Sequence, residues 1–186
     1  MLQLRAVAQR PAKESYVGIT LLERTRENHA LEHATIAILL RTLPRPVRML
    51  GRSTPSGFYL HGNVPTEHLT AAVEEALQRL RRGEASLAIS PLCGTNLAVA
   101  GVLAGLSAAA AFSAATRPER WLRAILTATA AALLAQPLGQ LLQKYVTTSA
   151  RLERVQVTRI LRTGRGSWTV HRVETRRVEP AGFDPS

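Results

Sequence analysis

Residues 97–142 read LAVAGVLAGLSAAAAFSAATRPERWLRAILTATAAALLAQPLGQLL, and they separate a mixed N-terminal part of the chain from a shorter polar C-terminal part. The stretch holds two apolar runs, 97–115 and 121–142, on either side of the charged turn Arg117-Pro118-Glu119-Arg120. Each run is close to the roughly 20 residues that a helix needs to cross the hydrocarbon core of a bilayer. The sequence therefore predicts a transmembrane helical hairpin over residues 96–145. An Ala-rich hairpin buried in a soluble protein is the alternative.

Several residues in and beside this stretch fit a membrane hairpin. Trp121 and Tyr145 lie where interfacial aromatic residues are expected. Gly101-Val-Leu-Ala-Gly105 is a pattern of small residues that lets two helices approach closely, so it would also allow a homodimer. Pro137 and Gly139 are expected to kink the second helix or to mark its approach to the interface.

The chain is strongly basic, with a formal net charge of +11, yet aromatic residues make up only 4% of it. Its arginines are scattered on both sides of the apolar stretch, as at Arg79 and Arg154, and they form no basic helix face interleaved with aromatics. We therefore do not expect nucleic acid as a partner. Basic flanks favour contact with anionic membrane lipid and slightly favour cytoplasmic N- and C-termini. A solubilising Arg-rich surface is the other interpretation.

Cysteine content and the first residues bear on the cellular compartment. Cys93 is the single cysteine, which excludes a disulfide within the chain and removes any need for an oxidising compartment. The stretch Met1-Leu-Gln-Leu-Arg5 lacks the apolar core of a signal peptide. We therefore expect membrane insertion to depend on the hairpin.

Around the hairpin, breakers and periodicity predict an α+β fold. The residues before 25 are left unassigned, because 16–22 fits either a short strand or a helix. The expected elements are a helix at 25–43, strands at 47–52 and 57–64, a helix at 66–83, a strand at 86–90, and strands at 152–162 and 167–175. The expected division is an N-terminal segment 1–24, a helix-strand-strand-helix-strand domain 25–95, the hairpin 96–145, a C-terminal β-hairpin 146–179 and a tail 180–186.

A metal site is indicated by Asn28-His29-Ala-Leu-Glu-His33. Residues one turn apart share a helix face, so His29 and His33 can present their imidazoles to one ion, with Glu32 beside them. This is the H-x-x-E-H order of the inverzincins. Two neutral imidazoles suit zinc or ferrous iron, and a nearby carboxylate can take a proton from a water on the ion.

Cys93 is the third candidate ligand. It lies in Pro91-Leu-Cys-Gly-Thr-Asn96, directly after the expected strand 86–90. A thiolate binds either metal strongly, and two histidines with one cysteine leave a position open for water or substrate. The sequence therefore predicts one divalent ion, zinc or ferrous iron. The alternative interpretation is that Cys93 binds no metal and is a small buried residue near a membrane helix.

This part of the chain resembles the metal-binding core of the S-ribosylhomocysteine lyase family. That family has an H-T-L-E-H helix, a strand pair carrying G-F-Y or G-Y-Y, a further helix and a C-G motif. Here the corresponding segments follow in the same order: His29-Ala-Leu-Glu-His33, Ser56-Gly-Phe-Tyr-Leu60, the helix from Thr66, and Cys93-Gly-Thr95.

The resemblance implies that His29, His33 and Cys93 bind the catalytic metal and that Glu32 is a general acid or base. It also implies a site between two subunits. Two positions depart from the lyase pattern: Thr54 stands where the lyase has its catalytic cysteine, and Arg48 replaces an acidic residue.

A second resemblance is to an uncharacterised family of bacterial membrane proteins with an N-H-A-L-E-H helix. This resemblance implies no activity. The expected location is the inner (cytoplasmic) membrane of a bacterium, as a multi-pass protein. The pitrilysin-type peptidases share the H-x-x-E-H helix but take a downstream glutamate as their third ligand. Here Glu74 and Glu75 are expected to point away from the apolar face of their helix into solvent.

Among the other histidines, His61 follows Gly57-Phe-Tyr59 on its strand and is the best remaining acid or base beside Glu32, although a surface histidine is as plausible. His68 and His171 are expected to be exposed.

Three functions remain open. The first is a membrane-anchored metal-dependent hydrolase, with a peptidase as one form, in which Glu32 is the general base. The second is a lyase or isomerase acting on a small polar metabolite, with Glu32 and His61 as its acid-base pair. The third is a non-catalytic membrane subunit or assembly factor with a structural or vestigial metal site and an unidentified protein partner.

Overall fold

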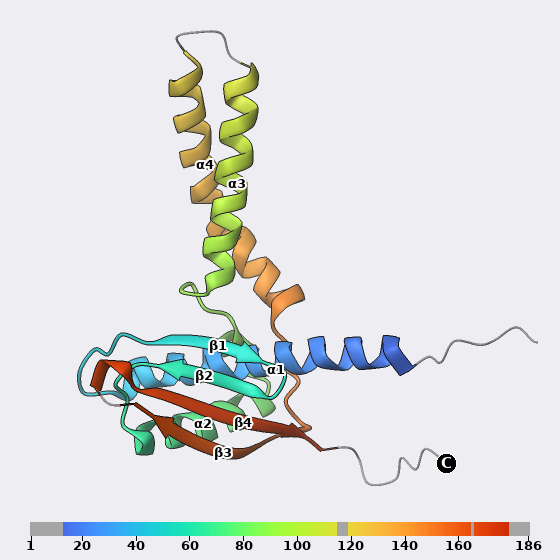
Figure 1. Ribbon diagram of the computed structural model, residues 1–186, viewed down its shortest axis with the longest axis vertical. Coiled ribbons are helices and arrows are strands. Elements are labelled where there is room, and N and C mark those ends of the chain that lie inside the picture. Colours follow the sequence, from blue (N-terminus) through green and yellow to red (C-terminus); the bar gives the residue numbers. More distant parts are fainter. Residues whose placement is uncertain (1–12, 115–118, 165, 179–186) are drawn as a thin grey trace, which may run out of the picture.

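The computed structural model describes residues 13–114, 119–164 and 166–178 (Figure 1). Residues 1–12 of the expected N-terminal segment, Arg117 and Pro118 of the charged turn, and the expected tail 180–186 lie outside the described residues.

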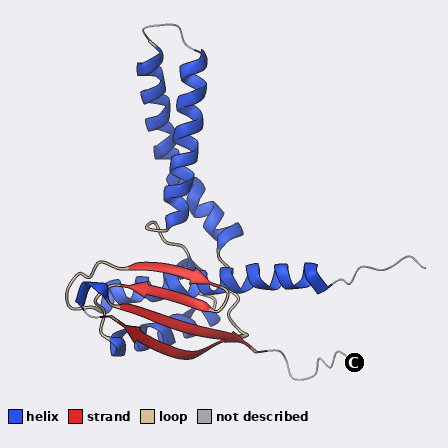
Figure 2. Cartoon of the chain, viewed as in Figure 1, coloured by secondary structure: helices blue, strands red, loops and turns tan. Residues whose placement is uncertain are grey.

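The chain has an α+β fold, as the sequence predicts, with a four-stranded antiparallel sheet and a protruding helical hairpin (Figure 2). The elements are α1 Lys13–Thr42, β1 Leu50–Thr54, β2 Gly57–His61, α2 Thr66–Arg81, the 3₁₀ helix η1 Ala85–Ala88, α3 Gly94–Ala114, α4 Arg120–Leu142, the π-helix η2 Gln143–Thr147, β3 Val155–Thr163, the 3₁₀ helix η3 Gly166–Trp168 and β4 Val170–Arg177.

The sheet joins segments from both sides of the helical hairpin. Its strand order is β1-β2-β4-β3, so the C-terminal strand β4 pairs with β2 along the register Gly57↔Glu174 to His61↔Val170. Helices α1 and α2 cover one face of the sheet (Figure 2), and the core between them buries Leu31, Phe58 and Val173 completely or almost so. The expected β-hairpin therefore forms and completes the sheet begun by β1 and β2. The domain boundaries themselves stay a prediction.

Two expectations about secondary structure are wrong. The first helix starts at Lys13 and not near 25, so residues 16–22 are helical and the Thr25 hydroxyl donates to the Leu21 carbonyl inside α1. The expected strand 86–90 is replaced by η1, whose Leu87 and Ala88 are buried. A short apolar run cannot be assigned by periodicity alone, because a buried helical turn and a buried strand look alike over four residues.

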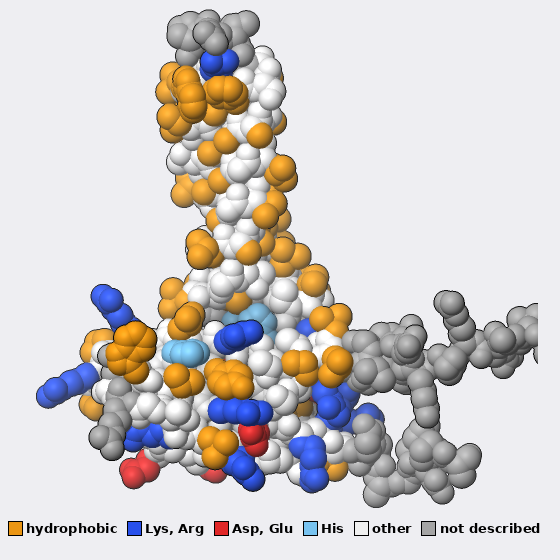
Figure 3. All heavy atoms as spheres, in the orientation of Figure 1, with side chains coloured by type: hydrophobic (Ala, Val, Ile, Leu, Met, Phe, Trp, Pro, Cys, Tyr) orange, Lys and Arg blue, Asp and Glu red, His pale blue; other side chains and the backbone are white. Residues whose placement is uncertain are grey.

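The hairpin protrudes from the body with its apolar side chains exposed (Figure 3). Helix α3 and the continuous helix Arg120–Thr147, formed by α4 and η2, are each long and apolar enough to cross a membrane. In the most apolar 18-residue stretch of each helix, the buried share is 0% for α3 and 11% for Arg120–Thr147. The hairpin is therefore not buried as the alternative interpretation required, and its apolar surface needs an environment that the described chain does not supply.

The structure gives different environments to Pro137 and to the three glycines of the hairpin. Pro137 lies inside α4, which bends in its second half (Figure 1). A Cβ at Gly139 would overlap the side chain of Asn96, so this glycine lets the start of α3 lie against α4. Gly101 and Gly105 face open space. Their predicted pairing with a second copy stays a prediction.

Candidate metal centre

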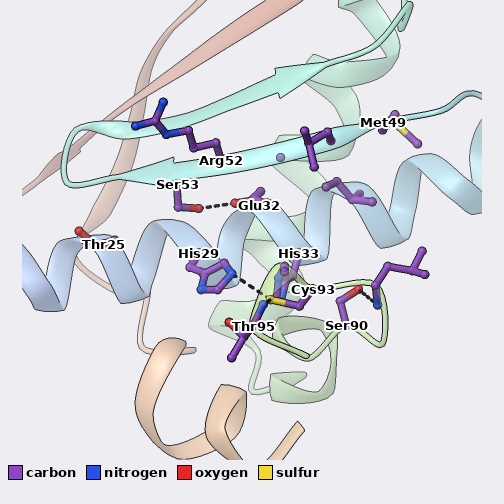
Figure 4. A pocket seen from close by; sticks show the side chains of 15 residues that line it. Thr25, His29, Glu32, His33, Met49, Arg52, Ser53, Ser90, Cys93 and Thr95 are labelled. Atoms are coloured by element: carbon purple, nitrogen blue, oxygen red, sulfur yellow. Dashed lines mark hydrogen bonds between the residues drawn. The ribbon is translucent and has the colours of Figure 1, made fainter. Parts of the chain in front are cut away.

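The three predicted ligands meet at the foot of the hairpin. His29 and His33 project from one face of α1, and Cys93 immediately precedes α3 (Figure 4). Their ligand atoms all lie within 4.8 Å of one another, and His29 Nε2 is 3.4 Å from Cys93 Sγ. They line a cavity of about 360 Å³ whose walls come from α1, β1 and the loop 90–95. This donor set can hold a metal ion and still be reached from the cavity.

Backbone carbonyls fix which nitrogen each imidazole presents. His29 Nδ1 donates to the Thr147 carbonyl at 2.9 Å, and His33 Nδ1 donates to the Ala88 carbonyl at 2.7 Å. A carbonyl can only accept, so each Nδ1 carries the proton and each Nε2 keeps a lone pair for a cation. The residue supplying the carbonyl to His33 belongs to η1, the element that replaced the expected strand.

Cys93 is ready to bind as a thiolate. Burial opposes ionisation, but hydrogen bonds from His29, His33 and Thr95 outweigh it and lower the pKa of the thiol to about 5. The backbone N–H of Thr95, in the first turn of α3, lies 3.4 Å from Sγ. For His29, burial works against protonation, yet the contacts with Cys93 and the Thr147 carbonyl leave its pKa raised. Without metal the two groups therefore share an imidazolium-thiolate pair.

This ionisation predicts how Cys93 reacts in the metal-free protein. Because the pKa is lowered, the thiolate persists at neutral pH and is lost only as the pH falls through about 5. We expect iodoacetamide alkylation of chelator-treated protein to follow a titration with a midpoint near 5. A His29→Ala variant should shift the midpoint upward, and a wild-type midpoint above pH 8 would contradict the assignment.

Glu32 lies beside the ligands and is held by β1. The carboxylate accepts a short hydrogen bond from the Ser53 hydroxyl (Figure 4), and it packs so closely on Gly51 that a Cβ there would overlap it. Glu32 is 94% buried. Burial raises the pKa of its carboxyl, against the opposing effects of Ser53, His33 and His29. A raised pKa suits a group that must take up and return a proton near neutrality.

The foot of α4 positions the loop that carries Cys93. Gln143, fully buried in η2, donates from Nε2 to the Ser90 carbonyl at 3.0 Å and to Asn96 Oδ1 at 2.8 Å. Its Oε1 accepts from the Ser90 N–H at 2.8 Å. Both ends of the 90–96 loop are thus tied to one side chain. Because Thr147 of the same π-helix holds His29, η2 positions two of the three ligands.

We expect Gln143→Leu to weaken metal binding without removing a ligand. The substitution leaves the Ser90 N–H and Asn96 Oδ1 without this partner, so the Cys93 loop loses its fixed position. Loss of such an outer partner typically lowers metal affinity by about 10–100-fold. Competition with a chelator of known affinity measures this. The matched control is Gln140→Leu, the same change at an exposed position of α4. Equal affinity in both variants would contradict the positioning role.

The structure separates the remaining candidates from this centre. His61 is exposed at the end of β2. It is not among the described residues that line the cavity. Glu74 and Glu75 are exposed as predicted, and so is His68. The Thr54 hydroxyl donates to the Gly57 carbonyl at 3.0 Å, within the β1–β2 turn.

The expectation for His171 is wrong. It is fully buried, because β4 lies inside the sheet rather than in a free hairpin, and its Nε2 lies 3.0 Å from the Thr66 hydroxyl. Burial, and then Arg162, lower its pKa. It takes no part in the metal centre.

Sequence reasoning missed Ser53, Gln143 and the Thr147 carbonyl. Ser53 gave no signal beyond its place near a turn. Gln143 did offer one, since a polar side chain at the end of an apolar helix is expected to have a specific partner.

Comparison with known proteins adds a family but no activity. The sequence profile described as Domain of unknown function (DUF6391) matches residues 24–160. An uncharacterized protein of Picosynechococcus sp. (strain PCC 7002) is 39% identical over 145 residues, which cover 73% of this chain and 71% of that relative. No solved structure matches the chain.

Proposed function

Since this chain belongs to the DUF6391 family, whose domain carries no assigned function, we propose its role from the metal centre itself: a membrane-anchored, metal-dependent hydrolase. One observation carries the proposal. His29 Nε2, His33 Nε2 and Cys93 Sγ converge within 4.8 Å beside the buried carboxylate of Glu32, on a cavity open enough to admit a substrate. A purely structural site would not need a proton acceptor of raised pKa beside an accessible cavity.

The residues divide the work of hydrolysis between them. A zinc or ferrous ion held by the three ligands would supply Lewis acidity, polarising a carbonyl and acidifying a water. Glu32 would accept the proton of the attacking water and return it to the leaving group. Ser53 would keep the carboxylate oriented by its hydrogen bond, and Gly51 leaves the space that the carboxylate occupies. Amide or ester bonds, peptides included, are the substrates suited to this arrangement.

The lyase or isomerase alternative has less support in the site. It needs a second acid-base group opposite Glu32, and the side chain at the lyase cysteine position, Thr54, is engaged with Gly57. His61, its other candidate, is exposed on β2. Ser53, which does contact Glu32, ionises too weakly to replace a cysteine near neutral pH.

We place the hairpin in a bacterial inner membrane with both termini on the cytoplasmic side. The support is the length and exposure of α3 and α4, together with basic residues such as Lys144 and Arg151 after the hairpin. The metal centre would then lie at the membrane surface, in contact with lipid headgroups.

Elemental analysis of the detergent-purified protein tests the proposal. We expect near-stoichiometric zinc or iron in the wild type after anaerobic purification, and loss of that metal in a His29→Ala, Cys93→Ala double variant. A wild-type protein that stays metal-free after reconstitution would contradict the hydrolase proposal. A non-catalytic membrane subunit would then be the better interpretation. A coordinatively saturated ion, with no position exchangeable by added ligand, would do the same.

A further inference from the structure

The cavity of the metal centre has a neighbouring hollow on the side of the hairpin. A second hollow, of about 250 Å³, lies between the lower parts of α3 and α4, and it shares Leu92 and Cys93 with the metal cavity. A group bound at the metal could therefore extend past Leu92 into the hairpin without crossing the core of the domain.

Small apolar side chains form one part of the lining of the second hollow, and polar groups form the other part. Leu97 and Ala100 contribute from α3, and Ala132 and Ala135 from α4. The short side chains of these three alanines leave room for a slender group such as an unbranched chain. The polar residues at this hollow, Asn96 and Gln136, lie 3.5 Å apart and bond each other.

The mouth of the metal cavity is also apolar. Leu50 on β1 and Leu92 on the loop both line the cavity, and they are 69% and 79% exposed. Ile36 and Met49 also line the cavity. Two exposed leucines beside the metal-binding residues offer apolar surface that a bound apolar group would remove from water.

Building on the proposed hydrolase function, we propose that the substrate is an amphiphile with a single long apolar chain, joined to its polar part through an ester or amide bond. The carbonyl of that bond lies at the metal centre beside Glu32. The chain passes Leu92 and occupies the groove between α3 and α4. The hairpin is then part of the binding site as well as an anchor, and it admits substrate directly from the bilayer.

Hydroxamates of different chain length test this without knowledge of the substrate. Acetohydroxamate and dodecanohydroxamate share one metal-chelating group and differ in the apolar chain. Each is titrated into the cobalt-substituted full-length protein in phospholipid nanodiscs, and the change in the visible cobalt spectrum reports binding at the metal. We expect the dodecyl compound to bind more tightly than acetohydroxamate in the wild type.

Two variants separate binding in the groove from simple partition into lipid. Ala132→Phe fills the groove, whereas Ala130→Phe makes the same change on α4 outside its lining. We expect Ala132→Phe to reduce the chain-length advantage at least tenfold with acetohydroxamate affinity unchanged, and Ala130→Phe to keep the full advantage. If Ala132→Phe alters folding, its acetohydroxamate affinity reveals this, and Ala100→Leu serves instead.

The outcomes distinguish the two proposals. An equal chain-length advantage in wild type, Ala132→Phe and Ala100→Leu would overturn the amphiphile proposal, because the chain would then gain only from the bilayer. The metal centre would survive, since acetohydroxamate still binds. A protein that takes up no cobalt would overturn the hydrolase proposal itself, and the substrate proposal with it.

Discussion

Glu32→Gln is expected to keep the metal and lose turnover. Glutamine has the size of glutamate and can still accept the Ser53 hydrogen bond through its carbonyl oxygen, so the packing on Gly51 is preserved. Its amide cannot accept a proton at neutral pH. Removal of a positioned general base typically lowers the rate by about 10²–10⁴-fold. We therefore expect kcat to fall by that factor with the metal content unchanged.

The measurement pairs kcat on the ester or amide found by screening with elemental analysis of the same sample. Glu75→Gln is the matched control, because Glu75 is an exposed carboxylate on α2 that pairs with Arg79. It should retain full activity. A Glu32→Gln protein with wild-type kcat would show that proton transfer does not pass through this carboxylate.

Removal of the metal should lower the thermal unfolding midpoint strongly. The ligands join α1 to the 90–95 loop, so they converge only when the domain is folded, and an ion that binds only the folded state stabilises it by mass action. With free metal at 1,000 times Kd this amounts to about 4 kcal/mol. For a chain of this size such a change corresponds to a fall of roughly 8–16 °C.

Circular dichroism of the detergent-solubilised protein, heated with and without a strong chelator, measures this fall. In the His29→Ala, Cys93→Ala variant the chelator should leave the midpoint unchanged. Equal midpoints for wild type with and without chelator, in a sample shown to contain metal, would mean that the ion does not connect α1 to the loop.

The ligand set was predictable because its signals are local. His29 and His33 are one helical turn apart within a single helix, with Glu32 beside them, and the spacing alone places the two imidazoles on one face. The hairpin was predictable for a similar reason, since two long apolar runs leave few alternatives. The structure brings Cys93 to the two histidines as predicted, although a short 3₁₀ helix, and not a strand, precedes it.

The parts that sequence could not predict depend on long-range contacts. Whether His171 is exposed depends on whether its strand is an edge or lies inside the sheet, and only the pairing of β4 with β2 answers that. Gln143 contacts Ser90, 53 residues earlier in the chain. Its place at the end of an apolar helix indicates that it has a partner, but no local pattern indicates which residue that partner is. The choice between η1 and a strand at 86–90 depends on packing against α1, because such a short apolar run fits both.

The pairing of β4 with β2 also sets an order of events during synthesis. When β2 leaves the ribosome its neighbour β4 has not yet been made, and the whole helical hairpin is translated between them. Likewise, Asn28 Oδ1 on α1 accepts a hydrogen bond of 2.7 Å from the Thr175 hydroxyl, which is translated much later. Distant pairings form late, since the intervening chain must be closed first. If the hairpin inserts into a membrane as proposed, it therefore does so before the sheet closes. The candidate metal centre, which needs the Thr147 carbonyl behind the hairpin, is assembled after both histidines and Cys93 have been translated.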